Sequence, residues 1–192
     1  AERFVEAWHA RLPPALPVYE LPDNAVEQLV GFNFHRGVLA CGRRIAEPTL
    51  AEIVPPWPQP ISLVVLPDVQ SPENLGVILR ISAALGVDAV LLGPRAGDPL
   101  SRRVLRTSMG YALHVPLITL REPIREVEQL AKEQQVTLIA TALAPHAVDL
   151  RALQPMPRQA ILFGSEGHGL EPDFLQLCEH LVTIPMRAGI DS

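Results

Sequence analysis

The sequence predicts an α/β protein in which a parallel sheet is covered by helices on both faces. From about residue 60 onward, short apolar segments alternate with helix-like segments, the order typical of βαβ units. The apolar segments also lack the alternation of polar and apolar residues that marks a half-exposed strand, so we expect strands buried on both faces.

Each expected element follows from its local pattern. Residues 61–66 (ISLVVL) form the first apolar strand, and Leu75, Ile78 and Leu79 recur with helical spacing after it. Pro72 and Glu73 suit the first turn of that helix. The further expected strands are 88–93, 114–120, 137–143, 159–164 and 181–186, and the expected helices are 74–85, 101–110, 122–135 and 172–178.

The domain organisation follows from a proline-rich stretch. Residues 54–60 (VPPWPQP) contain four prolines, which remove backbone donors and favour an extended chain. We therefore expect a partial N-terminal domain (1–44), a linker (45–60) and the α/β domain (61–192). Because the sequence begins at Ala1 and ends abruptly at Ser192, we expect it to be a piece of a longer protein.

Composition excludes several classes. Hydrophobic residues make up 48% of the 192 residues, enough for a sizeable core, and no apolar run approaches a membrane span. The two cysteines lack a CxxC or Cys/His cluster, which disfavours a metal site and favours a reduced cytoplasm. A net charge of −5 disfavours nucleic-acid binding. Between residues 95 and 106, however, Asp98 is the single acidic residue beside four arginines: Arg95, Arg102, Arg103 and Arg106. They form either a solvated helix face or a phosphate-binding patch.

The loop and helix after the first strand contain the first candidate site. Helical side chains lean toward the helix N-terminus, so the Arg80 guanidinium should lie over Gly76. A glycine here costs about 1 kcal/mol relative to alanine, which suggests space kept open for a ligand. The alternative is that Arg80 is a surface residue paired with Glu73, and the sequence does not separate the two.

A glycine-rich loop follows the strand 159–164. Residues 161–170 (ILFGSEGHGL) contain three glycines, which permit positive φ and close backbone approach. Their spacing matches neither GxGxxG nor a Walker A motif. Glu166 would repel a phosphate, so the loop suits a neutral or cationic ligand, although a tight strand-to-helix connection would also explain the glycines. His35 and His168 are weaker candidates for acid–base groups.

Together with the segment IPMRAGIDS (residues 184–192), these loops resemble the three motifs of SpoU/TrmH-type SPOUT RNA methyltransferases. The first motif corresponds to SPENLGVILR (71–80), the second to GSEGHGL (164–170) and the third to IPM (184–186) with Ser192. Ser71 stands where the family usually has Asn or Asp. Ser165 stands where it usually has Asn. The sequence also stops before the asparagine-containing helix that ends the third motif. Residues 31–44 look like the junction that follows the small RNA-binding domain of two-domain members.

The resemblance implies a C-terminal deep trefoil knot, a homodimer, S-adenosylmethionine as cofactor, and methyl transfer to a ribose 2′-hydroxyl of tRNA or ribosomal RNA. Arg80, Asn74 and Glu166 would be catalytic, and Arg36, Arg102, Arg103 and Arg106 would contact RNA. The cofactor would be bound by Thr141, Ala142, Leu143, Leu162, Phe163, Gly164, Glu166, Gly167, Ile184, Pro185, Met186 and Ser192. The three glycines would let the backbone press against the cofactor, whose sulfonium and amine suit Glu166.

Two other hypotheses remain. One is a non-catalytic RNA-binding relative that keeps the fold, which the abrupt end and Ser165 would favour. The other is an unrelated nucleotide-binding or dehydrogenase domain, which is disfavoured because no dinucleotide fingerprint follows any expected strand.

Overall fold

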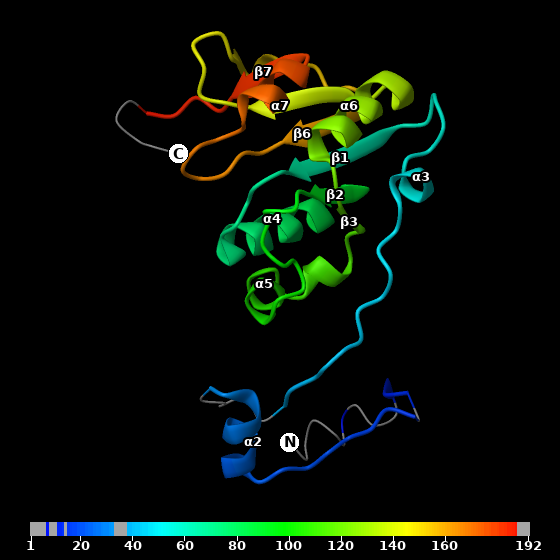
Figure 1. Ribbon diagram of the computed structural model, residues 1–192, viewed down its shortest axis with the longest axis vertical. Helices are drawn as coiled ribbons and strands as arrows, with labels where there is room; N and C mark the ends of the chain where they lie inside the picture. The colour runs from blue at the N-terminus through cyan, green and yellow to red at the C-terminus, as the bar shows by residue number, and fades with distance from the viewer. Residues whose placement is uncertain (1–6, 8–10, 14, 33–37, 188–192) are drawn as a thin grey trace. The chain divides into compact units, whose positions relative to one another are not determined.

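A computed structural model of the chain describes residues 7, 11–13, 15–32 and 38–187. The chain divides into two compact units, residues 1–45 and 46–192, which can be followed by colour in Figure 1. The first unit contains helix α2 (Asp23–Val30), which ends at Gly31 with φ of 71°. No helix among the described residues is long and apolar enough to span a membrane.

The second unit is built on one sheet with the strand order β3-β2-β1-β6-β4-β7-β5 (Figure 1). All of its strand pairs are parallel, so the predicted parallel sheet is confirmed. Strand β5 is a two-residue strand at the sheet edge that the sequence did not predict. The strands are β1 (Ile61–Leu66), β2 (Ala89–Leu92), β3 (Leu117–Thr119), β4 (Thr137–Thr141), β5 (Val148–Asp149), β6 (Arg158–Leu162) and β7 (His180–Thr183).

Local sequence explains where the main helices begin. In α4, the Ser71 hydroxyl accepts a hydrogen bond from the Asn74 backbone N–H at 3.3 Å, and Pro72 occupies the first turn, as its fixed φ favours. Helix α6 likewise begins at a proline, Pro123. The α-helices of this unit are α3 (Leu50–Ile53), α4 (Pro72–Leu85), α5 (Arg102–Thr107), α6 (Pro123–Gln134) and α7 (Pro172–Leu177), with 3-10 turns η2 (Tyr111–Leu113) and η3 (Leu150–Ala152).

The hydrophobic core has two parts, one on each face of the sheet. Leu63 and Val65 of β1 belong to the part that includes Val127 of α6 and Phe174 of α7. The alternate β1 residues Val64 and Leu66 belong to the other part, with α4 and α5. Because successive strand residues point to opposite faces, an apolar strand without alternation supplies both parts, as expected.

The segment before β1 belongs to the second unit and packs against its core. Leu50 and Ile53 of α3, with Val54, contact the core beside α6 and α7. The Glu47 carboxylate accepts hydrogen bonds from the Thr119 backbone N–H at 2.9 Å and from its hydroxyl at 3.0 Å. Residues 46–60 thus form a short helix and make specific contacts, although they are rich in proline.

Candidate active site at the carboxyl edge of the sheet

The loops that carry the sequence motifs gather at one edge of the sheet. Strands β1, β6, β4 and β7 are consecutive neighbours and run in the same direction. The loops that follow them therefore lie side by side at their carboxyl ends, where ligands bind in open α/β sheets.

Two candidate catalytic residues from distant parts of the chain meet at this edge. The Asn74 side chain, in the first turn of α4, donates a hydrogen bond to the Glu166 carboxylate at 2.5 Å. The two residues are 92 positions apart in the chain. Both are exposed, so the contact joins the first two motifs at a surface that a ligand can reach.

Glu166 lies in a tight turn, which we call the Gly-rich hairpin (residues 164–169). Ser165 and Gly169 exchange two backbone hydrogen bonds, of 3.0 and 2.9 Å. Gly169 has φ of 67°, and a Cβ at Gly164 would lie 2.0 Å from the Gly169 carbonyl carbon. The hairpin itself therefore requires two of the glycines. At Gly167, by contrast, a Cβ would meet nothing within 4 Å.

The expected reason for a glycine at position 76, space kept open for a ligand, is wrong. A Cβ at Gly76 would lie 1.8 Å from the Thr107 Oγ1 atom and 2.8 Å from the Thr107 Cβ. The Thr107 hydroxyl also donates a hydrogen bond to the Pro72 carbonyl at 3.2 Å. Position 76 therefore requires a glycine because α5 packs directly against α4. No room for a ligand is left above it.

Arg80 is exposed on α4. The alternative that it pairs with Glu73 is also wrong, because Glu73 forms its ion pair with Arg103 of α5. Arg80 lies six residues after Asn74, which corresponds to about 9 Å along the helix axis. The structure thus brings Asn74 to Glu166 and leaves the long Arg80 side chain exposed farther along the same helix.

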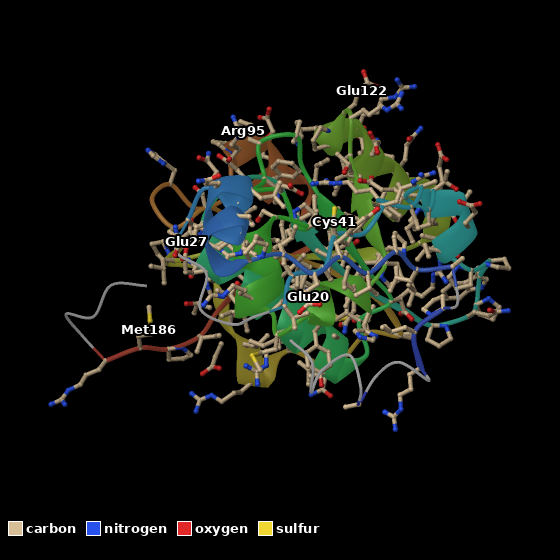
Figure 2. The ribbon with its side chains drawn as sticks, turned by 90° about the horizontal axis from the view of Figure 1, so that it is seen from below. Glu20, Glu27, Cys41, Arg95, Glu122 and Met186 are labelled. Atoms are coloured by element: carbon tan, nitrogen blue, oxygen red, sulfur yellow. The ribbon has the colours of Figure 1, made fainter. Side chains whose placement is uncertain are left out.

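The loops after β4 and β7 present apolar side chains to solvent. Leu143 is 67% exposed, Ile184 65% and Met186 41%, and Figure 2 shows Met186 on the extended segment after β7. The Thr141 hydroxyl donates to the Leu162 carbonyl at 2.9 Å, which ties the ends of β4 and β6 together. The Leu162 side chain is fully buried, so only its backbone could face a ligand.

A cavity of about 380 Å³ lies at the same edge. Of the predicted cofactor-binding residues it includes only Gly164, so it is next to the predicted cofactor site but distinct from most of it. It is lined by Pro67, Asp68, Arg95, Gly164, Ser165, His168, Gly169, Leu170, Glu171 and Pro172.

Arg95 forms ion pairs with Asp68 and Glu171 at this cavity. The hydrogen bond to Glu171 is the main reason that the pKa of Arg95 is raised, followed by the Asp68 charge. In the sequence, Arg95 stands out only as part of a basic run. A sequence signal did exist, because all three residues follow expected strands at the same sheet edge.

The remaining candidates are placed as follows. Arg102, Arg103 and Arg106 are exposed on α5, and Arg103 is paired with Glu73. Arg36 and Ser192, like His35, lie outside the described residues. No group of His, Cys, Asp and Glu residues in the described part of the chain could hold a metal ion.

Comparison with known proteins places these features in a family. The sequence model of the SpoU rRNA methylase family matches residues 62–192. An uncharacterized tRNA/rRNA methyltransferase of Mycobacterium bovis is 38% identical over 181 residues, which cover 92% of this chain and 61% of the relative. The chain therefore spans about three-fifths of that relative's length.

One further relative and one solved structure add detail. The 23S rRNA (guanosine-2′-O-)-methyltransferase RlmB of Vibrio vulnificus is 29% identical over 210 residues, which cover this whole chain and 83% of the relative. The crystal structure of an AdoMet-bound rRNA methyltransferase from Sinorhizobium meliloti superposes with a TM-score of 0.66 at 28% identity. The superposition covers 77% of this chain and 55% of that structure.

Proposed function

The chain belongs to the SpoU rRNA methylase family, and from this premise we propose that it transfers a methyl group from S-adenosylmethionine to a ribose 2′-hydroxyl of tRNA or ribosomal RNA. The relative RlmB is named as a guanosine-2′-O-methyltransferase of 23S rRNA, which supports the ribose oxygen as acceptor. The observation that carries the proposal is the Asn74–Glu166 hydrogen bond, because it joins two family motifs at the ligand-binding edge of the sheet.

The edge next to this contact suits the cofactor. Its adenosine and methionine parts need apolar cover, and Leu143, Ile184 and Met186 supply exposed apolar side chains there. The open space at Gly167 allows close backbone approach, and the Glu166 carboxylate complements a cationic ligand. A relative that is 28% identical has been crystallised with AdoMet. The backbone of residues 141–143, 162–164 and 184–186 would complete the cofactor site.

The chemistry assigns distinct tasks to the catalytic candidates. When bound, the cofactor supplies a methyl group on a positively charged sulfur. The new bond would join the methyl carbon to the ribose 2′-oxygen while the bond from that carbon to sulfur breaks and leaves a neutral thioether, and the hydroxyl proton would pass to water. A guanidinium with a pKa above about 12 is a poor base, so Arg80 grips a phosphate and stabilises the developing alkoxide. Asn74 and Glu166 hold the two motif loops together beside the reacting atoms.

The proposal includes the family's wider architecture. Residues 1–44 would be part of an RNA-binding domain, residues 45–60 its linker, and residues 61–192 the knotted methyltransferase domain. Strand β6 lies between β1 and β4, both of which precede it in the chain, and this order is compatible with a threaded C-terminal segment. The exposed Arg102, Arg103 and Arg106 would contact RNA phosphates, and Arg36 would add a contact from the N-terminal domain.

A homodimer is part of the same proposal. Val77, Ile81 and Leu85 are spaced four residues apart on α4 and are all exposed, so they form an apolar stripe. Leu113 of η2, a turn that contacts α4, is also exposed. An unpartnered apolar stripe on a helix that carries Arg80 suits a second copy of the chain packed beside the active site.

The test is methyl transfer from labelled S-adenosylmethionine to total RNA from cells that lack the gene. We expect Arg80→Ala to lower incorporation by about 100-fold or more, as the loss of a group that stabilises developing charge does. Its affinity for S-adenosylmethionine should be close to that of the unaltered chain. Arg125→Ala, which removes an exposed ion pair on α6, is the matched control. Cofactor and RNA binding without any transfer by the unaltered chain would support the non-catalytic relative instead.

A further inference from the structure

We propose that Arg95 is a positioning residue that holds the Gly-rich hairpin against the loop between β1 and α4. The inference rests on the proposed function, because it concerns how Glu166 reaches Asn74. Arg95 belongs to neither of the loops that it connects, and no family motif quoted above includes it.

The backbone on both sides of Arg95 is fixed to the loop after β1. The Gly93 N–H donates to the Leu66 carbonyl, and the Gly97 N–H donates to the Val69 carbonyl, both at 3.0 Å. A Cβ at Gly93 would lie 2.1 Å from the Pro67 carbonyl oxygen, so the two loops are in direct backbone contact. Arg95 therefore extends from a rigid base.

From this base the guanidinium contacts two carboxylates on different segments. Asp68, in the loop after β1, lies 3.3 Å from the Arg95 Nη2 atom. Glu171, immediately before α7, accepts a hydrogen bond from the same nitrogen. Glu171 follows the Gly-rich hairpin by two residues, so Arg95 ties the base of the hairpin to the first motif loop.

The hairpin is thus attached at two points. Glu166 bonds to Asn74 near its tip, and Glu171 bonds to Arg95 beyond its base. Gly167 has open space around it, and the cavity lies along the same hairpin. A hairpin with few neighbours depends on these attachments for its orientation, and errors of about 1 Å in a catalytic group can cost 100-fold in rate.

The interaction should affect local order much more than global stability. Arg95 is 55% exposed and Glu171 52%, and exposed ion pairs contribute little to the stability of a fold. Arg125 and Glu122 form a comparably exposed pair, but that pair is local to α6. Arg125→Ala is therefore the matched control for Arg95→Ala.

The first measurement is hydrogen exchange in the cofactor-free chain, which does not depend on any activity. We expect the amides of residues 164–171 to exchange about 5-fold faster in Arg95→Ala, as the loss of an exposed ion-pair network allows. Arg125→Ala should leave these amides unchanged. Arg95→Lys should restore part of the protection, since lysine keeps the positive charge but presents it on a more compact head group. Unchanged exchange in Arg95→Ala, or an increase spread evenly over residues 46–187, would overturn the proposal.

The second measurement is calorimetric titration of the same variants with S-adenosylmethionine. We expect an approximately 10-fold weaker affinity in Arg95→Ala, with Arg95→Lys between it and the unaltered chain. Equal affinity of Arg95→Ala and the unaltered chain would overturn the positioning role. If the unaltered chain binds no cofactor, the proposed function fails, and the exchange result alone decides whether Arg95 orders the hairpin.

Discussion

The arginines at the two ends of the parallel strands differ in burial. At the amino end of β6, Arg158 is 2% exposed. It donates to the Gln134 carbonyl at 3.0 and 2.9 Å and also to the Gln59 carbonyl. By contrast, Arg95 at the carboxyl edge and Arg80 on α4 are exposed. A buried arginine whose three nitrogens each donate a hydrogen bond stabilises the fold, whereas exposed arginines remain available to ligands and loops. The two edges should therefore respond differently to mutation.

The largest effect on stability is expected for Arg158→Met. The methionine would fill part of the space but would leave the Gln134 and Gln59 carbonyls without their donor. Hydrogen bonds from a charged group contribute about 1.5–3 kcal/mol each, so we expect a loss of about 3 kcal/mol in the free energy of unfolding. Urea denaturation measures it. A loss below about 1 kcal/mol would contradict a stabilising role for the buried guanidinium.

A large effect at the carboxyl edge is expected for Gly164→Ala. Its Cβ would lie 2.0 Å from the Gly169 carbonyl carbon, a backbone contact that cannot be relieved by a side-chain rotation. We expect a loss of about 1–3 kcal/mol in stability and loss of S-adenosylmethionine binding by titration. Gly167→Ala is the control, because it meets open space and should keep its thermal midpoint. Equal destabilisation by both changes would contradict the described hairpin.

A smaller effect on stability is expected for the pair Asn74→Ala and Glu166→Ala. Both residues are exposed, so we expect each change to alter stability by less than about 1 kcal/mol. Each should weaken S-adenosylmethionine binding, and the double variant should be little worse than either single one, because the two side chains act through one contact. Calorimetry on the four chains measures the coupling. Strictly additive losses would show that the two residues act independently.

The smallest effect on stability near neutral pH is expected from the ionisation of the Cys178 thiol. Burial, with a smaller contribution from the Glu179 charge, raises the pKa of this thiol from its ordinary 9.0 to about 12. The folded state therefore keeps the proton. The resulting stabilisation is complete below pH 9 and is lost as the pH rises from 9 toward 12. At pH 8, iodoacetamide should modify the exposed Cys41 and spare Cys178, as mass spectrometry would show. Equal modification would place Cys178 in solvent.

The general fold could be predicted because its signals are local. Continuous apolar strands, helix spacing at Leu75, Ile78 and Leu79, and Pro72 in a first turn are all visible within a few residues. The expected elements overlap β1–β4, β6 and β7 and the helices α4–α7, with ends that differ by up to three residues. The two-residue β5 and the four-residue α3 are too short to produce such a pattern.

The site could be predicted only in part, because several of its features depend on distant partners. The small size of Gly76 is explained by Thr107, which lies on another helix. The partners of Arg95 include Glu171, 76 positions away, and Arg158 is bonded to Gln59, 99 positions away. No periodicity within the sequence reports such pairs. An arginine at the start of a strand gives no indication that it is buried.

Calorimetric titration of this chain with S-adenosylmethionine tests the cofactor site most directly. We expect micromolar or tighter binding with about one site per subunit, lost in Gly164→Ala and retained in Arg158→Met at a temperature where that variant is folded. Absence of binding by the folded, unaltered chain would contradict the claim that the carboxyl edge of its sheet is a cofactor site.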